Sequence, residues 1–233
     1  AGWQQEALGG EQMQSHRQYW LSRFSGELPV LELPADRSRP PVQRHRGSRV
    51  KFQFDSDQSA AFQRLLQEHQ ATLFMGVTAL VNILLFRYSG QPDLVIGTPV
   101  AGRDHPDLEG QVGYYLNTLA LRNQINGADS FEKILGQLRE DTVEALSHQS
   151  YPFDLLVEEL GLGSDQSRSP LFDVVVILQN IDLNNDEALQ LNGVKVSQEP
   201  ARIEISKSDL RFQFIAGKQN GILYGNIEYN TDI

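Results

Sequence analysis

Four successive segments between residues 49 and 98 differ in the spacing of their apolar residues, and this order strongly constrains the fold. Residues 49–55 alternate between apolar and polar side chains, which predicts a half-buried strand. Residues 56–70 carry apolar side chains at helical spacing, and residues 73–88 are apolar on nearly all sides, so both predict helices. Residues 93–98 form a short continuous apolar run that is typical of a central strand.

The residues at the ends of these segments are of the kinds that begin and end helices. Asp55 or Ser56 can cap the first helix and Thr72 the second, because a short side-chain oxygen accepts a hydrogen bond from a free backbone N–H group of the first turn. Gly90 follows the second helix, where glycine readily adopts the left-handed conformation that ends a helix.

The second half of the chain is rich in predicted strands. Asp129 and Glu132 predict a capping box for a helix that ends near His148, and a short helix at 153–160 follows Pro152. The predicted strands are residues 116–122, 171–178, 194–196, 201–205, 210–214 and 222–229, the last two joined by a turn at 217–221. A strand, two helices and a strand followed by a β-rich end predict an α/β sandwich, a mixed sheet covered by helices.

The first 46 residues differ from the rest in character. Residues 11–25 predict a helix whose aromatic side chains, including Trp20 and Phe24, face inward. Four prolines between residues 28 and 47 predict an extended connector. The five arginines between residues 37 and 49 are interpreted as a solvated linker rather than an anion site. We therefore divide the chain at about residue 46, into residues 1–46 and residues 47–233.

Composition excludes several classes of protein. The 233 residues contain no cysteine, so a disulfide framework is excluded and the cytoplasm is the expected location. A formal net charge of −10 argues against a nucleic-acid surface. The longest apolar run, Leu73–Phe86, is shorter than the roughly 20 residues that a membrane span needs, and the first residues do not resemble an export signal. No membrane association is expected.

Two histidines and three acidic residues are of types that can form a functional site, but their surroundings favour structural interpretations. His105 is interpreted as a loop residue, and His148 as a residue that ends a helix, where an imidazolium ion favours the helix dipole. Asp104, Asp107 and Glu109 are spaced as in a calcium loop, but the bidentate glutamate that such a loop needs is missing. No metal site and no catalytic residue are predicted in this chain.

Two long motifs carry most of the functional information. The first runs from Ile96-Gly-Thr-Pro-Val-Ala-Gly-Arg-Asp-His105 through Val112-Gly-Tyr-Tyr-Leu-Asn-Thr-Leu-Ala-Leu-Arg122. The second joins His148-Gln-Ser-Tyr-Pro-Phe-Asp-Leu-Leu-Val-Glu-Glu-Leu160 to Ser167-Arg-Ser-Pro-Leu-Phe172 and to Gln179-Asn180.

Together these motifs resemble the C-terminal half of a condensation domain from a nonribosomal peptide synthetase. The resemblance implies the chloramphenicol-acetyltransferase-like α/β fold. It covers essentially the whole chain, with one departure. The family's general-base motif, His-His-x-x-x-Asp-Gly, is absent, because no two of the five histidines are adjacent.

The resemblance assigns the polar residues of the two motifs to a tunnel through which thioester-bound groups enter. One wall would contain Gly97, Thr98, Pro99 and Arg103, another Asn117 and Thr118, and the reaction chamber would lie near Gln179 and Asn180. A few polar groups in a mostly apolar passage can orient a bound thioester. The alternatives are structural: Arg103 would anchor its loop, Asn117 would cap a strand end, and the two amides of 179–180 would close a strand or turn.

The resemblance also implies an activity and its partners. Such a domain forms amide bonds between acyl or aminoacyl groups that the phosphopantetheine arms of upstream and downstream peptidyl carrier proteins hold as thioesters. The other expected partners are the missing N-terminal condensation subdomain and a neighbouring adenylation domain. The chain alone is expected to be inactive, because the histidine base is absent. The alternatives are a non-catalytic module that binds carrier proteins, or half of a related epimerisation, heterocyclisation or coenzyme A-dependent acyltransferase domain.

Overall fold

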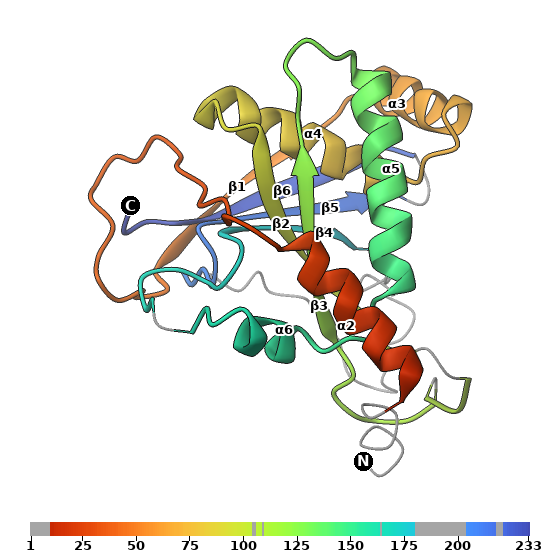
Figure 1. Ribbon diagram of the computed structural model, residues 1–233. Coiled ribbons are helices and arrows are strands. Elements are labelled where there is room, and N and C mark those ends of the chain that lie inside the picture. The colour runs from red at the N-terminus through yellow and green to blue at the C-terminus, as the bar shows by residue number, and fades with distance from the viewer. Residues whose placement is uncertain (1–9, 104–105, 109, 164, 180–203, 218–220) are drawn as a thin grey trace, which may run out of the picture.

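A computed structural model describes residues 10–103, 106–108, 110–163, 165–179, 204–217 and 221–233. The described residues form a six-stranded sheet in the order β1-β6-β5-β4-β2-β3, with helices packed against it (Figure 1). The strands are β1 (Gly47–Gln53), β2 (Asp93–Val100), β3 (Asn117–Gln124), β4 (Val174–Gln179), β5 (Leu210–Ala216) and β6 (Leu223–Asn230). Strand β4 is parallel to both β2 and β5, and the other pairs are antiparallel. The predicted mixed sheet covered by helices is confirmed.

The helices form two groups. They are α2 (Glu11–Arg23), α3 (Ser56–Glu68), α4 (Leu73–Ser89), α5 (Phe131–Ser147) and α6 (Phe153–Glu159), with a short 3-10 helix η1 (Pro106–Leu108) between β2 and β3. Helix α4 contacts α3 and α5, whereas α2 and α6 contact each other near the β3 edge of the sheet (Figure 1). The predicted strand at 194–196 and most of the one at 201–205 lie outside the described residues.

Local signals account for most helix ends. Asp55 forms a capping box with Gln58, and the Thr72 hydroxyl accepts a hydrogen bond from the backbone N–H of Met75. Gly90 ends α4 with φ +71°, a left-handed conformation that other residues rarely adopt.

One predicted cap is wrong. Helix α5 begins one residue later than a cap at Asp129 would require, so the side chain of Ser130 accepts the hydrogen bond from the backbone N–H of Lys133, at 3.3 Å. Asp129 instead forms an ion pair with the Lys133 ammonium, with 2.7 Å between the nitrogen and the oxygen.

The main core lies between one face of the sheet and helices α3, α4 and α5. The strand residues in it include Ile96, Val174, Val176, Phe212 and Phe214. Helix α4 is apolar nearly all round because it packs on the sheet on one side and against α3 and α5 on others. A second cluster at the β3 edge contains Trp20 and Phe24 of α2, each only 2% exposed, which confirms the predicted inward aromatic face.

Strand β1 lies at the sheet edge and is only partly covered. Phe52 and Phe54 contact the core, with the Phe52 ring 5.9 Å from that of Phe214 between centroids. The same alternation places Val50 on the face of Phe52 and Phe54, but Val50 is 53% exposed and does not belong to the core.

The connector is extended as predicted, but it is not simply solvated. The Arg39 guanidinium pairs with the Asp209 carboxylate and donates to the Ser167 carbonyl at 3.1 Å. Arg46 pairs with Asp232. These arginines therefore fasten the connector to the segments around β5 and β6, because each meets a buried carboxylate there. The division at residue 46 stays a prediction.

No single helix of the described ranges is long and apolar enough to cross a membrane. Helices α3 and α4 are long and apolar enough only together, and they are bent by 107° relative to each other. The described side chains also include no group of three or more His, Asp and Glu residues placed to hold a metal ion.

Candidate functional site

The two sequence motifs meet at one end of neighbouring strands. Strands β2 and β3 pair so that Pro99 lies opposite Thr118 and Val100 opposite Asn117. Strand β4, from the second motif, runs beside β2, with Gly97 next to Val175. The two predicted tunnel walls are thus adjacent strands of one sheet. Pairing of β2 with β3 brings their residues side by side, although they are separated in the sequence.

Gly97 is buried beneath an aromatic ring of the second motif. A Cβ atom at this position would lie 2.3 Å from the Phe172 ring, closer than real side-chain atoms approach. Glycine is therefore required for Phe172 to pack on β2. Thr98 is 4% exposed and faces the main core side, whereas Pro99 is exposed. The tunnel roles of these three residues stay predictions.

Asn117 holds the turn that begins the second motif. Its amide nitrogen donates to the carbonyls of Gln149 and Tyr151, both at 2.8 Å, and its amide oxygen accepts from the backbone N–H of Phe153 at 3.1 Å. All three contacts are with the 149–153 turn, so Asn117 has a structural role, and its predicted place in the tunnel wall stays a prediction. The neighbouring Thr118 is half-buried, and its predicted contact with substrate is untested.

Arg103 anchors the loop between β2 and β3. Its guanidinium donates to the carbonyl of Leu108 and lies over the Tyr115 ring, 4.4 Å from the centroid. These contacts match the structural alternative for Arg103. In the same loop, Val112, Tyr114 and Leu116 are exposed by 104%, 86% and 53%, and we call these three residues the loop patch. His105 lies outside the described residues.

Gln179 belongs to a row of amides that crosses three strands. Its side-chain oxygen accepts from the Gln213 amide at 3.3 Å, and the Gln213 oxygen accepts from the Asn226 amide at 3.2 Å. The three residues come from β4, β5 and β6, on the face opposite Phe212 and Phe214. This amide row fixes the orientation of Gln179 at the end of β4. Asn180, predicted to lie beside it, is outside the described residues.

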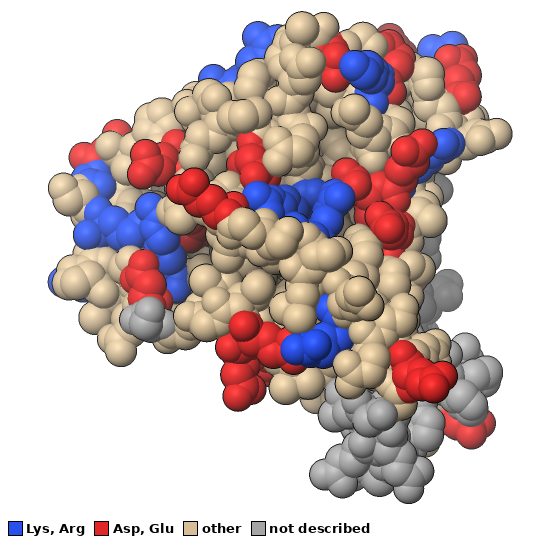
Figure 2. Space-filling view, viewed as in Figure 1, with Lys and Arg blue, Asp and Glu red and all other residues tan. Residues whose placement is uncertain are grey.

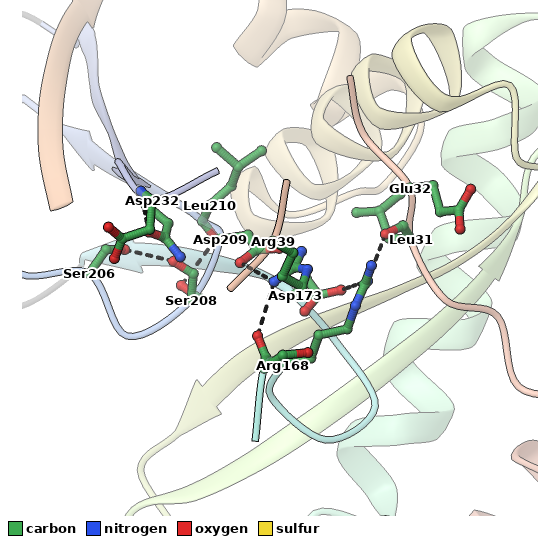
Figure 3. A network of polar contacts seen from close by, with 12 residues as sticks. Leu31, Glu32, Arg39, Arg168, Asp173, Ser206, Ser208, Asp209, Leu210 and Asp232 are labelled. Carbon is green, nitrogen blue, oxygen red and sulfur yellow. Dashed lines mark hydrogen bonds and ion pairs between the residues drawn. The ribbon is translucent and has the colours of Figure 1, made fainter. Parts of the chain in front are cut away.

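A buried charge network supports the start of β4. Arg168 donates to the Asp173 carboxylate at 2.7 Å and to the Leu31 carbonyl at 2.9 Å, and Arg39 pairs with Asp209 nearby (Figure 3). Burial raises the pKa of Asp173 to about 6, and the negative charge of Asp209 adds to this effect, against the two arginines.

The sequence does not predict this network because Arg39 and Asp209 are distant in the chain. Only Arg168 and Asp173 are close in the sequence. The only local signal was the Ser167-Arg-Ser-Pro segment, which places an arginine just before a buried strand. The face in Figure 2 shows basic and acidic side chains interspersed, consistent with the paired arginines.

Comparisons with known proteins agree with this geometry. A family model described as "Condensation domain" matches residues 1–233. Tyrocidine synthase 3 of Brevibacillus parabrevis is 45% identical over 213 residues, which are 91% of this chain and 3% of that protein. The X-domain from teicoplanin biosynthesis has 26% identity and a TM-score of 0.88 over 99% of this chain and 53% of that one.

A four-domain nonribosomal peptide synthetase solved with AMP and glycine has 25% identity and a TM-score of 0.85, covering 98% of this chain and 18% of that one. The chain therefore spans about half of the X-domain and a few per cent of the curated synthase. The expected chloramphenicol-acetyltransferase-like α/β class is confirmed by these structural neighbours.

Proposed function

Because the chain belongs to the condensation-domain family, we propose that it is the C-terminal subdomain of a domain that forms amide bonds between carrier-bound thioesters. The observation that carries this proposal is the meeting of the two family-like motifs on β2, β3 and β4, at one end of the sheet. In this role the chain positions two tethered reactants, which can supply a large part of the rate of a two-substrate reaction.

The proposed division of labour follows from the residues present. No two histidines are adjacent in this sequence, so we assign the general base to the N-terminal subdomain. The acceptor amine attacks the donor thioester carbonyl, the carbon–sulfur bond breaks, and the thiol remains on the donor's phosphopantetheine arm. That arm belongs to the carrier protein and is part of the substrate.

Gln179 is the described residue best placed to orient a reactant in this scheme. The amide row holds its oxygen on Gln213, so its side chain has a defined direction at the end of β4. A preoriented amide can donate to a carbonyl oxygen that gains charge during attack. Asn180 is proposed to act beside it, whereas Asn117 and Arg103 contribute by holding the turn and the loop that surround the site.

The partners are proposed from the same family membership. They are the two peptidyl carrier proteins, the N-terminal condensation subdomain, and a neighbouring adenylation domain, all in the cytoplasm. The loop patch is an exposed apolar surface of the kind that protein interfaces cover, and we assign it to contact with the N-terminal subdomain.

The test uses two carrier proteins loaded with a donor and an acceptor amino acid. Product is measured by mass spectrometry for this chain alone and for the same chain joined to its N-terminal subdomain. We expect no product from the chain alone and amide product from the joined domain. Binding of carrier proteins by the joined domain without any product would favour the interaction module, and product from free acyl-coenzyme A would favour the acyltransferase alternative.

The role of Gln179 is tested in the joined domain. Gln179→Ala should lower kcat by a factor of about 10 to 1,000 if the amide donates to the oxyanion. The matched control is Gln63→Ala on α3, outside the two motifs, which also removes one glutamine hydrogen bond, to the Gly221 carbonyl at 3.0 Å. Equal kcat values for the two variants would show that the Gln179 amide does not donate to the oxyanion.

A further inference from the structure

Two histidines from distant parts of the chain face each other between α2 and the end of α5. The Nδ1 atoms of His16 and His148 are 2.8 Å apart, and their rings meet edge to face with 5.0 Å between centroids. His16 is only 8% exposed, and His148 is the residue that ends α5. The sequence alone predicts for His148 only a favourable interaction of its imidazolium form with the dipole of the helix that it ends.

Two aromatic residues of α2 complete the contact with His148. The Tyr19 ring stacks on the His148 ring, with 4.1 Å between centroids and 7° between planes. The Trp20 indole nitrogen donates to the His148 carbonyl at 2.9 Å. One residue of the 148–153 turn therefore receives three separate contacts from α2.

The short distance between the two Nδ1 atoms limits the protons that the pair can hold. A neutral pair shares one hydrogen, because one Nδ1–H donates and the other Nδ1 accepts. A pair with one added proton can keep this hydrogen bond, since the extra proton occupies the other nitrogen of the donor ring. With two added protons both Nδ1 atoms carry hydrogen, neither can accept, and two positive charges face each other.

Among the described residues, the charged and titratable groups near this contact lie on α2, α5, α6 and the 148–153 turn. Helix α2 contributes Arg17, Tyr19 and Arg23; α5 contributes Asp141 and Glu144; the turn and α6 contribute Tyr151 and Glu159. Arg17 pairs with Glu159 and Arg23 with Asp141, so four of these charges are already matched. Burial lowers the pKa of His148, and the charge of His16 lowers it further, while Glu144 opposes both.

We propose that His16 and His148 form a proton-sensitive clasp, which is closed with no more than one added proton and opens when both rings are protonated. Opening separates Tyr19 and Trp20 from the 148–153 turn. The ion pairs Arg17–Glu159 and Arg23–Asp141 keep α2 attached at its middle and at its C-terminal end, and Asn117 holds the turn from the β3 side. Acid thus loosens one contact of α2 while the sheet stays folded.

The sign of the effect follows from the direction of the pKa shift. A histidine whose pKa is lower in the folded state binds its proton more readily when unfolded. The stability that the clasp contributes is therefore fully present above about pH 6.5, the ordinary histidine value, and is lost as the pH falls below it.

The test compares His148→Gln with His69→Gln in the full chain, with EDTA present. Glutamine retains a hydrogen-bonding amide but does not bind a proton. His69 is the matched control, because it ends α3 as His148 ends α5. Both variants and the wild type carry Trp3→Phe, so that Trp20 is the one remaining tryptophan of the chain. Melting temperature and Trp20 fluorescence quenching by acrylamide are measured from pH 7.5 to 5.0.

We expect the wild type and His69→Gln to lose a few degrees more in melting temperature than His148→Gln between pH 7.5 and 5.0. Trp20 should become more accessible to acrylamide in acid in the first two proteins, before the sheet unfolds. The comparison between variants removes the pH effects of other groups, including Asp173. Equal pH dependence in all three proteins would overturn the proposal.

A second measurement does not depend on any variant folding well. Nitrogen-edited NMR of the wild type reports the protonation of each imidazole nitrogen. A clasp predicts that the pair binds its two added protons in separate steps, and that the second proton is bound only at the pH where Trp20 becomes accessible. Protonation of both rings while Trp20 stays protected would equally overturn it.

Discussion

Substituting alanine for Gly97 tests how tightly the two motifs are packed together. The added Cβ would lie 2.3, 2.5 and 2.6 Å from three carbons of the Phe172 ring, whereas ordinary carbon contacts begin near 3.4 Å. The ring must move by about 1 Å, and overpacking of this size costs about 1–3 kcal/mol. For a chain of this length each kcal/mol corresponds to about 2–4 °C, so Gly97→Ala should lower the melting temperature by about 2–12 °C.

A control glycine and a compensating variant make this test specific. Gly136 lies within α5 with nothing within 4 Å of its added Cβ, so Gly136→Ala should stabilise the protein by about 0.5–1 kcal/mol. In a Phe172→Leu background the ring is gone, and the Gly97→Ala step should cost at least about 0.5 kcal/mol less. The reasoning is refuted if Gly97→Ala melts within about 1 °C of wild type, or costs the same in both backgrounds.

Three further changes should be measured by urea unfolding. Asn117→Ala removes three hydrogen bonds and should lower the free energy of unfolding by about 2–4 kcal/mol. The control Asn126→Ala removes one exposed hydrogen bond, from the N–H of Ala128, and should lower it by less than about 1 kcal/mol. Similar losses in the two variants would argue that Asn117 does not hold the 149–153 turn. Arg39→Ala leaves the carboxylate of Asp209, 6% exposed, without its guanidinium and should cost about 3–5 kcal/mol. Arg17→Ala, from a pair whose arginine is 44% exposed, should cost clearly less because water screens that pair. Because the pKa of Asp173 is raised to about 6, its ionised form costs stability at neutral pH, and this cost is relieved as the pH falls through 6 towards 4. Relative to Asp173→Asn, the wild type should therefore gain up to about 3 kcal/mol between pH 7.5 and 4; parallel pH curves would show that the carboxylate is not perturbed.

Elements specified by neighbouring residues were predictable from the sequence. Thr72 and Gly90 mark the ends of α4 because a cap depends on one side chain and one or two backbone groups within a single turn. The nearly all-round apolar surface of α4 likewise indicated that most of it is buried, although Leu84 and Tyr88 are exposed. The start of α5 was still predicted one residue too early. Asp129 and Ser130 are both residues that cap helices well, and the sequence does not show which of them precedes the first helical residue.

Features that depend on pairing between distant segments were not predictable in the same way. Gln179 was selected by resemblance, but its orientation depends on Gln213 and Asn226, which the strand register brings beside it. Gly97 resembled a tunnel-wall residue, and only the position of Phe172 shows why a side chain cannot be accommodated there. His148 was predicted only to end a helix, because the sequence does not show that α2 brings His16 into contact with it.

The pairing of β1 with β6 sets a delay in the folding of the chain as it is made. Val50 pairs with Ile227, and β6 also separates β1 from β5, so β1 cannot join the sheet through any other strand. At about 5–20 residues per second, ribosomes expose β6 roughly 10–35 s after β1. During that interval the backbone of β1 lacks its β6 partner and the Phe52 ring lacks Phe214 and Gly225, so both are open to chaperones or to other nascent chains. A pause in translation ahead of residue 223 would lengthen this exposure, so the position of β1 in the sheet depends on a strand that is made about 170 residues after it.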